Sequence, residues 1–63
     1  MSDSDYIIRL EADGTADVMR DRRAWRYDLA DLEEALAHVR RAEGKGRQVT
    51  VWEPDGRRRK IRT

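Results

Sequence analysis

The sequence predicts an α+β fold: a single small ββαββ domain in which one helix packs on one face of a four-stranded sheet. Three observations lead to this prediction. Apolar and polar residues alternate over 5–11 and 47–53, a helix-spaced apolar stripe lies between these two segments, and turn residues follow each of them. A chain of 63 residues allows one domain, residues 1–63, with a small core. It contains no cysteine, so no disulfide reinforces that core.

The first two strands are expected to form a hairpin. Residues 5–11 show the period of two that is typical of a strand with one wet face. The turn at 12–15 contains Gly14, which can take a positive φ without steric cost. A second strand should begin near Ala16, and we expect residues 1–4 to be disordered.

The next stretch, 19–27, is harder to interpret. The apolar residue Val18 is at an even position and Trp25 at an odd one, so the buried face changes between them. A bulge or a short turn near 21–23 would account for the change.

A helix is predicted from Asp28 to about Glu43. Its apolar stripe consists of Leu29, Leu32, Ala35, Leu36 and Val39. Asp28 is the expected N-cap, with Tyr27 and Leu32 packed together across the first turn. Acidic residues come early and basic residues late, which complements the helix dipole. Gly44 should provide the left-handed exit.

A second hairpin is predicted over about 47–62, around the turn Pro54-Asp55-Gly56. In a three-residue loop with a bulged glycine, Trp52 lies opposite Arg58. Alternation then directs one set of side chains toward the helix: Val49, Val51 and Ile61. The other set points away from it: Thr50, Trp52, Arg58 and Lys60.

This helix-free face is the candidate working surface. The residues expected to bind a partner or a nucleic acid are Ile7, Arg9, Trp52, Arg58, Lys60 and Arg62. Met19 or Trp25 could extend the surface. Because tryptophan and arginine dominate interface hot spots, we expect a small non-enzymatic binding or assembly protein, either a homodimer or other homo-oligomer, or a module that docks a protein partner.

Nucleic-acid binding through the basic C-terminal hairpin is the alternative, since an aromatic ring among cations can stack bases and hold phosphates. A third interpretation is that the basic residues of 57–62 only protect an edge strand from aggregation. The charge distribution is compatible with an anionic partner, because residues 1–34 carry a net charge of −5 and residues 35–63 carry +6.

Catalysis is not expected. His38 is the single histidine and there is no cysteine, so no nucleophile and base can be paired. The acidic clusters lack the spacing of a calcium loop, and Gly44-Lys45-Gly46 lacks the frame of a phosphate-binding loop. We therefore predict no catalytic residue, no metal, no cofactor and no small-molecule substrate. A cytoplasmic location without membrane contact is expected, because the sequence shows neither a basic, apolar leader nor a membrane span.

Two resemblances add to these expectations. The order of the elements and the Asp55-Gly56 turn make the chain similar to small uncharacterised bacterial ββαββ domains, which implies a fold and no activity. Residues 25–49 resemble the dimerisation module of actinobacterial nucleoid-associated xenogeneic silencers, in which a strand runs into a capped helix. That resemblance implies self-association. The chain departs from the silencers after this point, because 57–60 continue a strand where the silencers have a linker and a basic DNA-reading loop.

Overall fold

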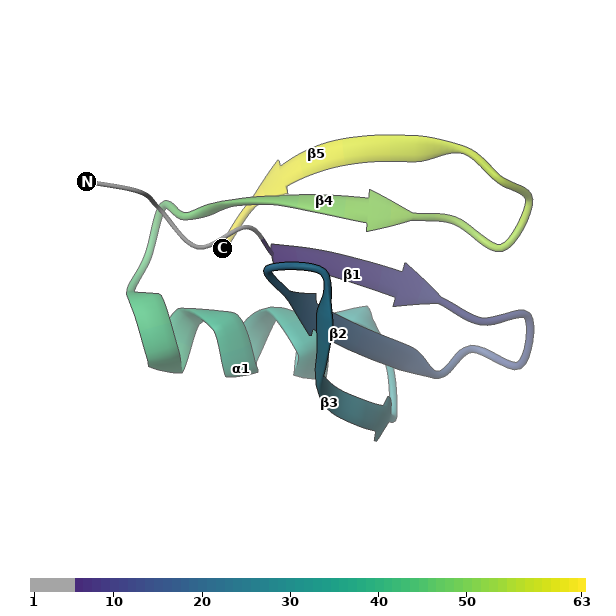
Figure 1. Cartoon of the computed structure of the whole chain (residues 1–63), viewed down its shortest axis with the longest axis horizontal. Helices are drawn as coiled ribbons and strands as arrows, with labels where there is room; N and C mark the ends of the chain where they lie inside the picture. Colours follow the sequence, from purple (N-terminus) through teal and green to yellow (C-terminus); the bar gives the residue numbers. More distant parts are fainter. Residues whose placement is uncertain (1–5) are drawn as a thin grey trace.

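The computed structural model describes residues 6–63, and the disorder expected for residues 1–4 lies outside them. The elements in chain order are β1 (Tyr6–Leu10), β2 (Ala16–Arg20), β3 (Arg23–Leu29), α1 (Leu32–Glu43), β4 (Gln48–Trp52) and β5 (Arg58–Arg62). All five strands join one sheet in the order β3-β2-β1-β4-β5 (Figure 1). The predicted four-stranded ββαββ arrangement is therefore wrong: the sheet is mixed and has five strands.

The unpredicted strand is β3, which pairs antiparallel with β2. The two strands are joined by Asp21 and Arg22, whose φ angles of 52° and 65° make a two-residue hairpin turn with both residues in the left-handed region. Such turns usually carry Asn-Gly or Asp-Gly, so this one has a weak sequence signal. The β2–β3 register also shifts on either side of Val18, as expected for bulged pairing, and this disrupts the apolar alternation.

The helix begins later than predicted, because the chain from Arg23 to Leu29 is extended. Asp31 is the N-cap, and its Oδ1 accepts a hydrogen bond from the Glu34 backbone N–H at 2.9 Å. The Glu34 carboxylate in turn accepts from the Ala30 N–H at 2.6 Å. Asp28 is not the cap, and the staple predicted between Tyr27 and Leu32 is wrong, since Tyr27 is 65% exposed.

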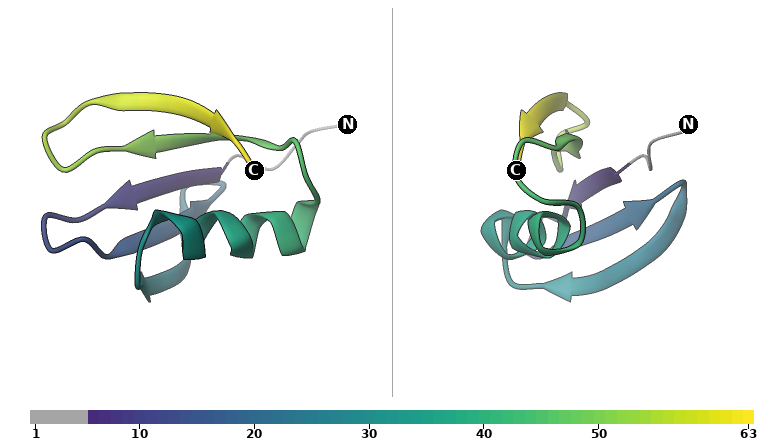
Figure 2. Two further views of the ribbon diagram at one scale, coloured as in Figure 1. Left: turned by 180° about the vertical axis from the view of Figure 1, so that it is seen from behind. Right: turned by 90° about the vertical axis from the view of Figure 1, so that its left-hand side faces the viewer.

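The helix ends as predicted at Gly44, which has a φ of 87° and donates its N–H to the Arg40 carbonyl. On the covered side, α1 packs across β1, β2 and β3 (Figure 2). The buried core contains Tyr6, Ile8, Ala16, Val18, Leu29, Ala35, Leu36, Val39, Val49 and Val51. Every apolar residue assigned to the helical stripe contributes to this core or packs on it, including Leu29, which closes β3 and precedes the helix.

The β1–β2 hairpin and the β4–β5 hairpin are joined through β1 and β4, which run parallel. The sequence left this direction open, and α1 provides the crossover that a parallel pair requires. Within the C-terminal hairpin, Trp52 pairs with Arg58 and Val49 with Ile61, in agreement with the predicted register. Because β1 and β4 point the same way, the tips of both hairpins lie at the same end of the sheet (Figure 1).

These two tips are built alike. Glu11 and Glu53 each accept a backbone hydrogen bond at 3.0 Å from the glycine three residues later, Gly14 and Gly56 respectively. Both glycines have positive φ, 93° and 95°, as the bulged three-residue turn requires. The chain thus uses one Glu-x-Asp-Gly turn twice, and the two copies stand next to each other on the central parallel strands.

Candidate binding surface on the open sheet face

The sheet has one face away from α1, here named the open face. Its members alternate with the buried residues along β1, β2, β4 and β5, so their side chains point to the opposite side. They are Ile7, Arg9, Asp17, Met19, Gln48, Thr50, Trp52, Arg58, Lys60 and Arg62. All six residues that the sequence nominated as a binding surface belong to this set.

Trp52 lies on the open face at the hairpin-tip end of β4, between two arginines on neighbouring strands. It pairs with Arg9 of β1 on one side and with Arg58 of β5 on the other. The Arg58 guanidinium carbon is 4.5 Å from the centroid of the indole ring, which is the geometry of a cation–π contact. The indole is only partly buried and is not part of the core, so its remaining surface is available for contact.

Cations line the outer part of this face. Arg58, Lys60 and Arg62 alternate along β5, and all three residues are exposed. Arg62 donates one side-chain hydrogen bond to the Gly46 carbonyl at 3.2 Å. None of the three has a carboxylate within ion-pair distance in the described part of the chain. Positive charge on β5 is therefore not neutralised on the open face.

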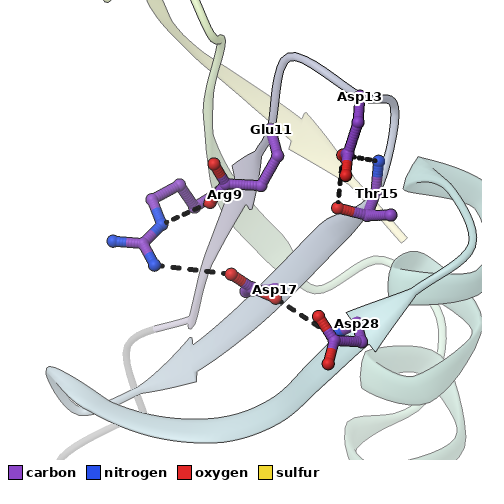
Figure 3. A network of polar contacts seen from close by, with 6 residues as sticks. All are labelled: Arg9, Glu11, Asp13, Thr15, Asp17 and Asp28. Atoms are coloured by element: carbon purple, nitrogen blue, oxygen red, sulfur yellow. Dashed lines mark hydrogen bonds and ion pairs between the residues drawn. The ribbon is translucent and has the colours of Figure 1, made fainter.

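The inner part of the face is polar but internally paired, as Figure 3 shows. The Arg9 guanidinium lies 3.2 Å from the Glu11 carboxylate and 3.4 Å from that of Asp17. The second oxygen of Asp17 accepts the backbone N–H of Asp28 at 3.0 Å. Asp17 thus links β1, β2 and β3, and its side chain is only 15% exposed. Sequence reasoning missed Asp17, because its role depends on strand β3, which was not predicted.

A shallow cleft of about 310 Å³ opens between the two hairpin tips. Trp52, Arg9 and Arg58 line it on the side of the open face, and Leu10 and Pro54 add apolar surface. The parallel alignment of β1 and β4 creates this cleft by placing two turns next to each other. The repeated Glu-x-Asp-Gly motif was the available sequence signal for it.

Trp25 does not extend the surface, contrary to one expectation. Its ring packs edge-on against Tyr6, with the ring centroids 5.6 Å apart, and it lies against the core. Met19 is the additional apolar member of the open face, where it pairs with Ile7. His38, the single histidine, is half-buried and lies in a shallow hollow with Trp25 and Arg41.

Two titratable groups have pKa values displaced by their surroundings. Burial, together with a hydrogen bond to Glu43, raises the pKa of Tyr6 above its ordinary value of 10.0. Hydrogen bonds from Thr15 lower the pKa of Asp13. The Tyr6 shift comes mainly from burial and the Asp13 shift from hydrogen bonding, and neither residue belongs to the open face. Within residues 6–63, no group of three or more histidine, cysteine or acidic side chains could hold a metal ion.

No known protein family matches the chain, and no curated protein or solved structure matches it either. The two resemblances noted from the sequence therefore stay predictions. No helix in the described part of the chain is long and apolar enough to span a membrane.

Proposed function

We infer that the chain is a non-enzymatic docking protein whose open face binds an acidic partner protein around Trp52. The observation that carries the proposal is the strip of Arg58, Lys60 and Arg62 beside a partly exposed indole, without neutralising carboxylates among the described residues. Charge of one sign steers an oppositely charged partner, and an exposed tryptophan supplies the apolar anchor of a hot spot.

A second copy of the chain complements this surface less well. In a symmetric pair with faces together and strands aligned, β5 lies opposite either the partner's β5 or its other edge strand, β3. The first arrangement sets cations against cations. The second places them over β3, where pairing with Arg20 and Val18 sets Arg23 and Arg26 on the helix side of the sheet. The first arrangement is repulsive, and the second offers the three cations of β5 a strand with one carboxylate, Asp28. An acidic protein therefore complements this surface better than a second copy does.

Nucleic-acid binding is the second candidate, and the stacked Trp52–Arg58 pair next to Lys60 is the observation that favours it. Base stacking on an indole and phosphate contacts to Lys and Arg would use the same residues. The two candidates differ in their ligands, so one set of variants separates them.

The test compares a labelled acidic peptide with a mixed-sequence single-stranded oligonucleotide, each titrated against the full chain at low salt. Trp52→Ala should weaken peptide binding by about tenfold or more. Lys60→Ala should weaken peptide binding more than Arg40→Ala does. Arg40→Ala is the matched control, because it removes one exposed positive charge from the end of the helix. Far-ultraviolet circular dichroism should show the helix unchanged in all three variants.

Three results would change the proposal. If neither ligand is retained at low salt, the docking function is wrong. Tighter binding to the oligonucleotide, with a steep salt dependence, would favour the second candidate. Self-association of the unliganded chain in sedimentation, abolished by Trp52→Ala, would show that the surface binds its own copy.

A further inference from the structure

We propose that the outer edge of β5 receives the acidic partner as an additional strand. The proposal rests on the docking function above and specifies how the partner binds. It concerns the backbone of β5, which is the last strand of the sheet and, among residues 6–63, has a neighbouring strand on one side only (Figure 1). An edge strand with free N–H and C=O groups is a template for another extended segment.

The hydrogen bonds at the two ends of the hairpin show which groups are free. The Glu53 N–H donates to the Arg57 carbonyl at 2.7 Å, and the Thr63 N–H donates to the Arg47 carbonyl at 2.9 Å. In an antiparallel ladder, residues that exchange hydrogen bonds alternate with residues that point outward. The pairs Glu53–Arg57 and Arg47–Thr63 are hydrogen-bonded, so every second pair between them is hydrogen-bonded too. These pairs place Arg59 and Ile61 in hydrogen bonds to β4. The outward-facing N–H and C=O groups belong to Arg58, Lys60 and Arg62.

The same three residues carry the uncompensated cations of the open face. Alternate residues of a strand recur about every 6.8 Å, so a strand added beside β5 places every second side chain opposite one of these cations. Carboxylates at those positions would form cross-strand pairs with Arg58, Lys60 and Arg62. Backbone hydrogen bonds would supply affinity, and the alternation of acidic residues would supply selectivity.

A second copy of β5 cannot use this edge in the same way. Antiparallel pairing of two β5 strands would bring Arg58, Lys60 and Arg62 close to their counterparts, and like charges directly opposite each other are destabilising. The other edge of the sheet is a poorer template, because the register of β3 shifts along its length. The positive charge of β5 and its regular register therefore make it the better edge for an added strand, and the added strand is an acidic extended segment.

The test uses a peptide of about seven residues that alternates glutamate with threonine, blocked at both ends, titrated against the isotope-labelled full chain. Amide exchange at Arg58, Lys60 and Arg62 should slow by about tenfold or more on binding. Exchange at Arg59 and Ile61 should change little, since their N–H groups already bond to β4. These two residues serve as internal controls on the same strand.

A pair of N-methylated peptides provides the matched control in the ligand. Methylation of the amides that face β5 removes the hydrogen bonds to the edge, whereas methylation of the alternate amides leaves them. The first peptide should bind about tenfold more weakly than the second, although both carry the same charge. Slower exchange at the edge amides together with this difference would support strand addition.

Failure of this proposal can be told apart from failure of the docking function. Strand addition is wrong if the edge amides exchange at their free rate and the two methylated peptides bind equally well. The docking function stands in that case, provided that binding of the unmodified peptide depends on Trp52 and Lys60. If the peptide does not bind at low salt, both proposals are wrong. Oligonucleotide binding without slowed exchange at the edge amides would also overturn strand addition.

Discussion

Replacing Arg22 with glycine is expected to stabilise the protein, because Arg22 has a φ of 65° in the turn between β2 and β3. A side chain with a Cβ atom costs about 1–2 kcal/mol in the left-handed region, and glycine avoids this cost. The greater freedom of glycine in the unfolded chain offsets about 0.5–1 kcal/mol of the gain. Arg22 is exposed, so little packing is lost. The free energy of unfolding should therefore rise by about 0.5–1 kcal/mol.

Urea denaturation is the assay, with the midpoint expected to rise while the slope m stays constant. In thermal unfolding the same gain corresponds to an increase in Tm of about 2–8 °C for a domain of this size. Arg22→Ala is the matched control, since it removes the same charge but keeps a Cβ atom. The reasoning is refuted if the glycine variant is no more stable than the alanine variant. That result would mean that the turn is not left-handed at Arg22 and that β3 begins differently.

The remaining predictions concern the helix and the core. Asp31→Ala should lower the free energy of unfolding by about 1 kcal/mol, because it removes the acceptor for the Glu34 N–H. Asp31→Asn keeps an acceptor and should retain most of this stability. Equal losses of stability for the two variants in urea denaturation would argue against capping. Tyr6→Phe should cost about 1–2 kcal/mol near neutral pH through loss of the 2.9 Å hydrogen bond to Glu43. Folding raises the pKa of Tyr6, so the folded protein holds the phenol proton more tightly than the unfolded chain does. This contribution to the free energy of unfolding is complete below about pH 10, the pKa of the unfolded chain, and is lost as the pH rises through the raised pKa of the folded protein. Unfolding measured between neutral and alkaline pH should thus be less pH-dependent in Tyr6→Phe, and parallel profiles for the two proteins would contradict this assignment.

The parts of the fold that could be predicted are those determined by residues close together in the chain. Pro54, Asp55 and Gly56 restrict their own φ angles, and a turn of known type determines which residues pair behind it. This local chemistry was sufficient to place Trp52, Arg58 and Lys60 on one face. The helix was likewise predicted from its stripe and its glycine exit. Its N-cap was misplaced by three residues, from Asp31 to Asp28, because Leu29 is buried whether it belongs to a strand or to a helix.

By itself, the sequence determined the α+β class, the C-terminal hairpin with its register, and the membership of the candidate surface, because turn chemistry and alternation act between near neighbours. Tertiary structure decided that β3 is a strand and that β1 and β4 run parallel. These features depend on pairing between distant segments. Pairing with β2 holds Asp21 and Arg22 in conformations that neither residue prefers alone, and the burial of Ile8 and Val51 on neighbouring strands aligns the two hairpin tips.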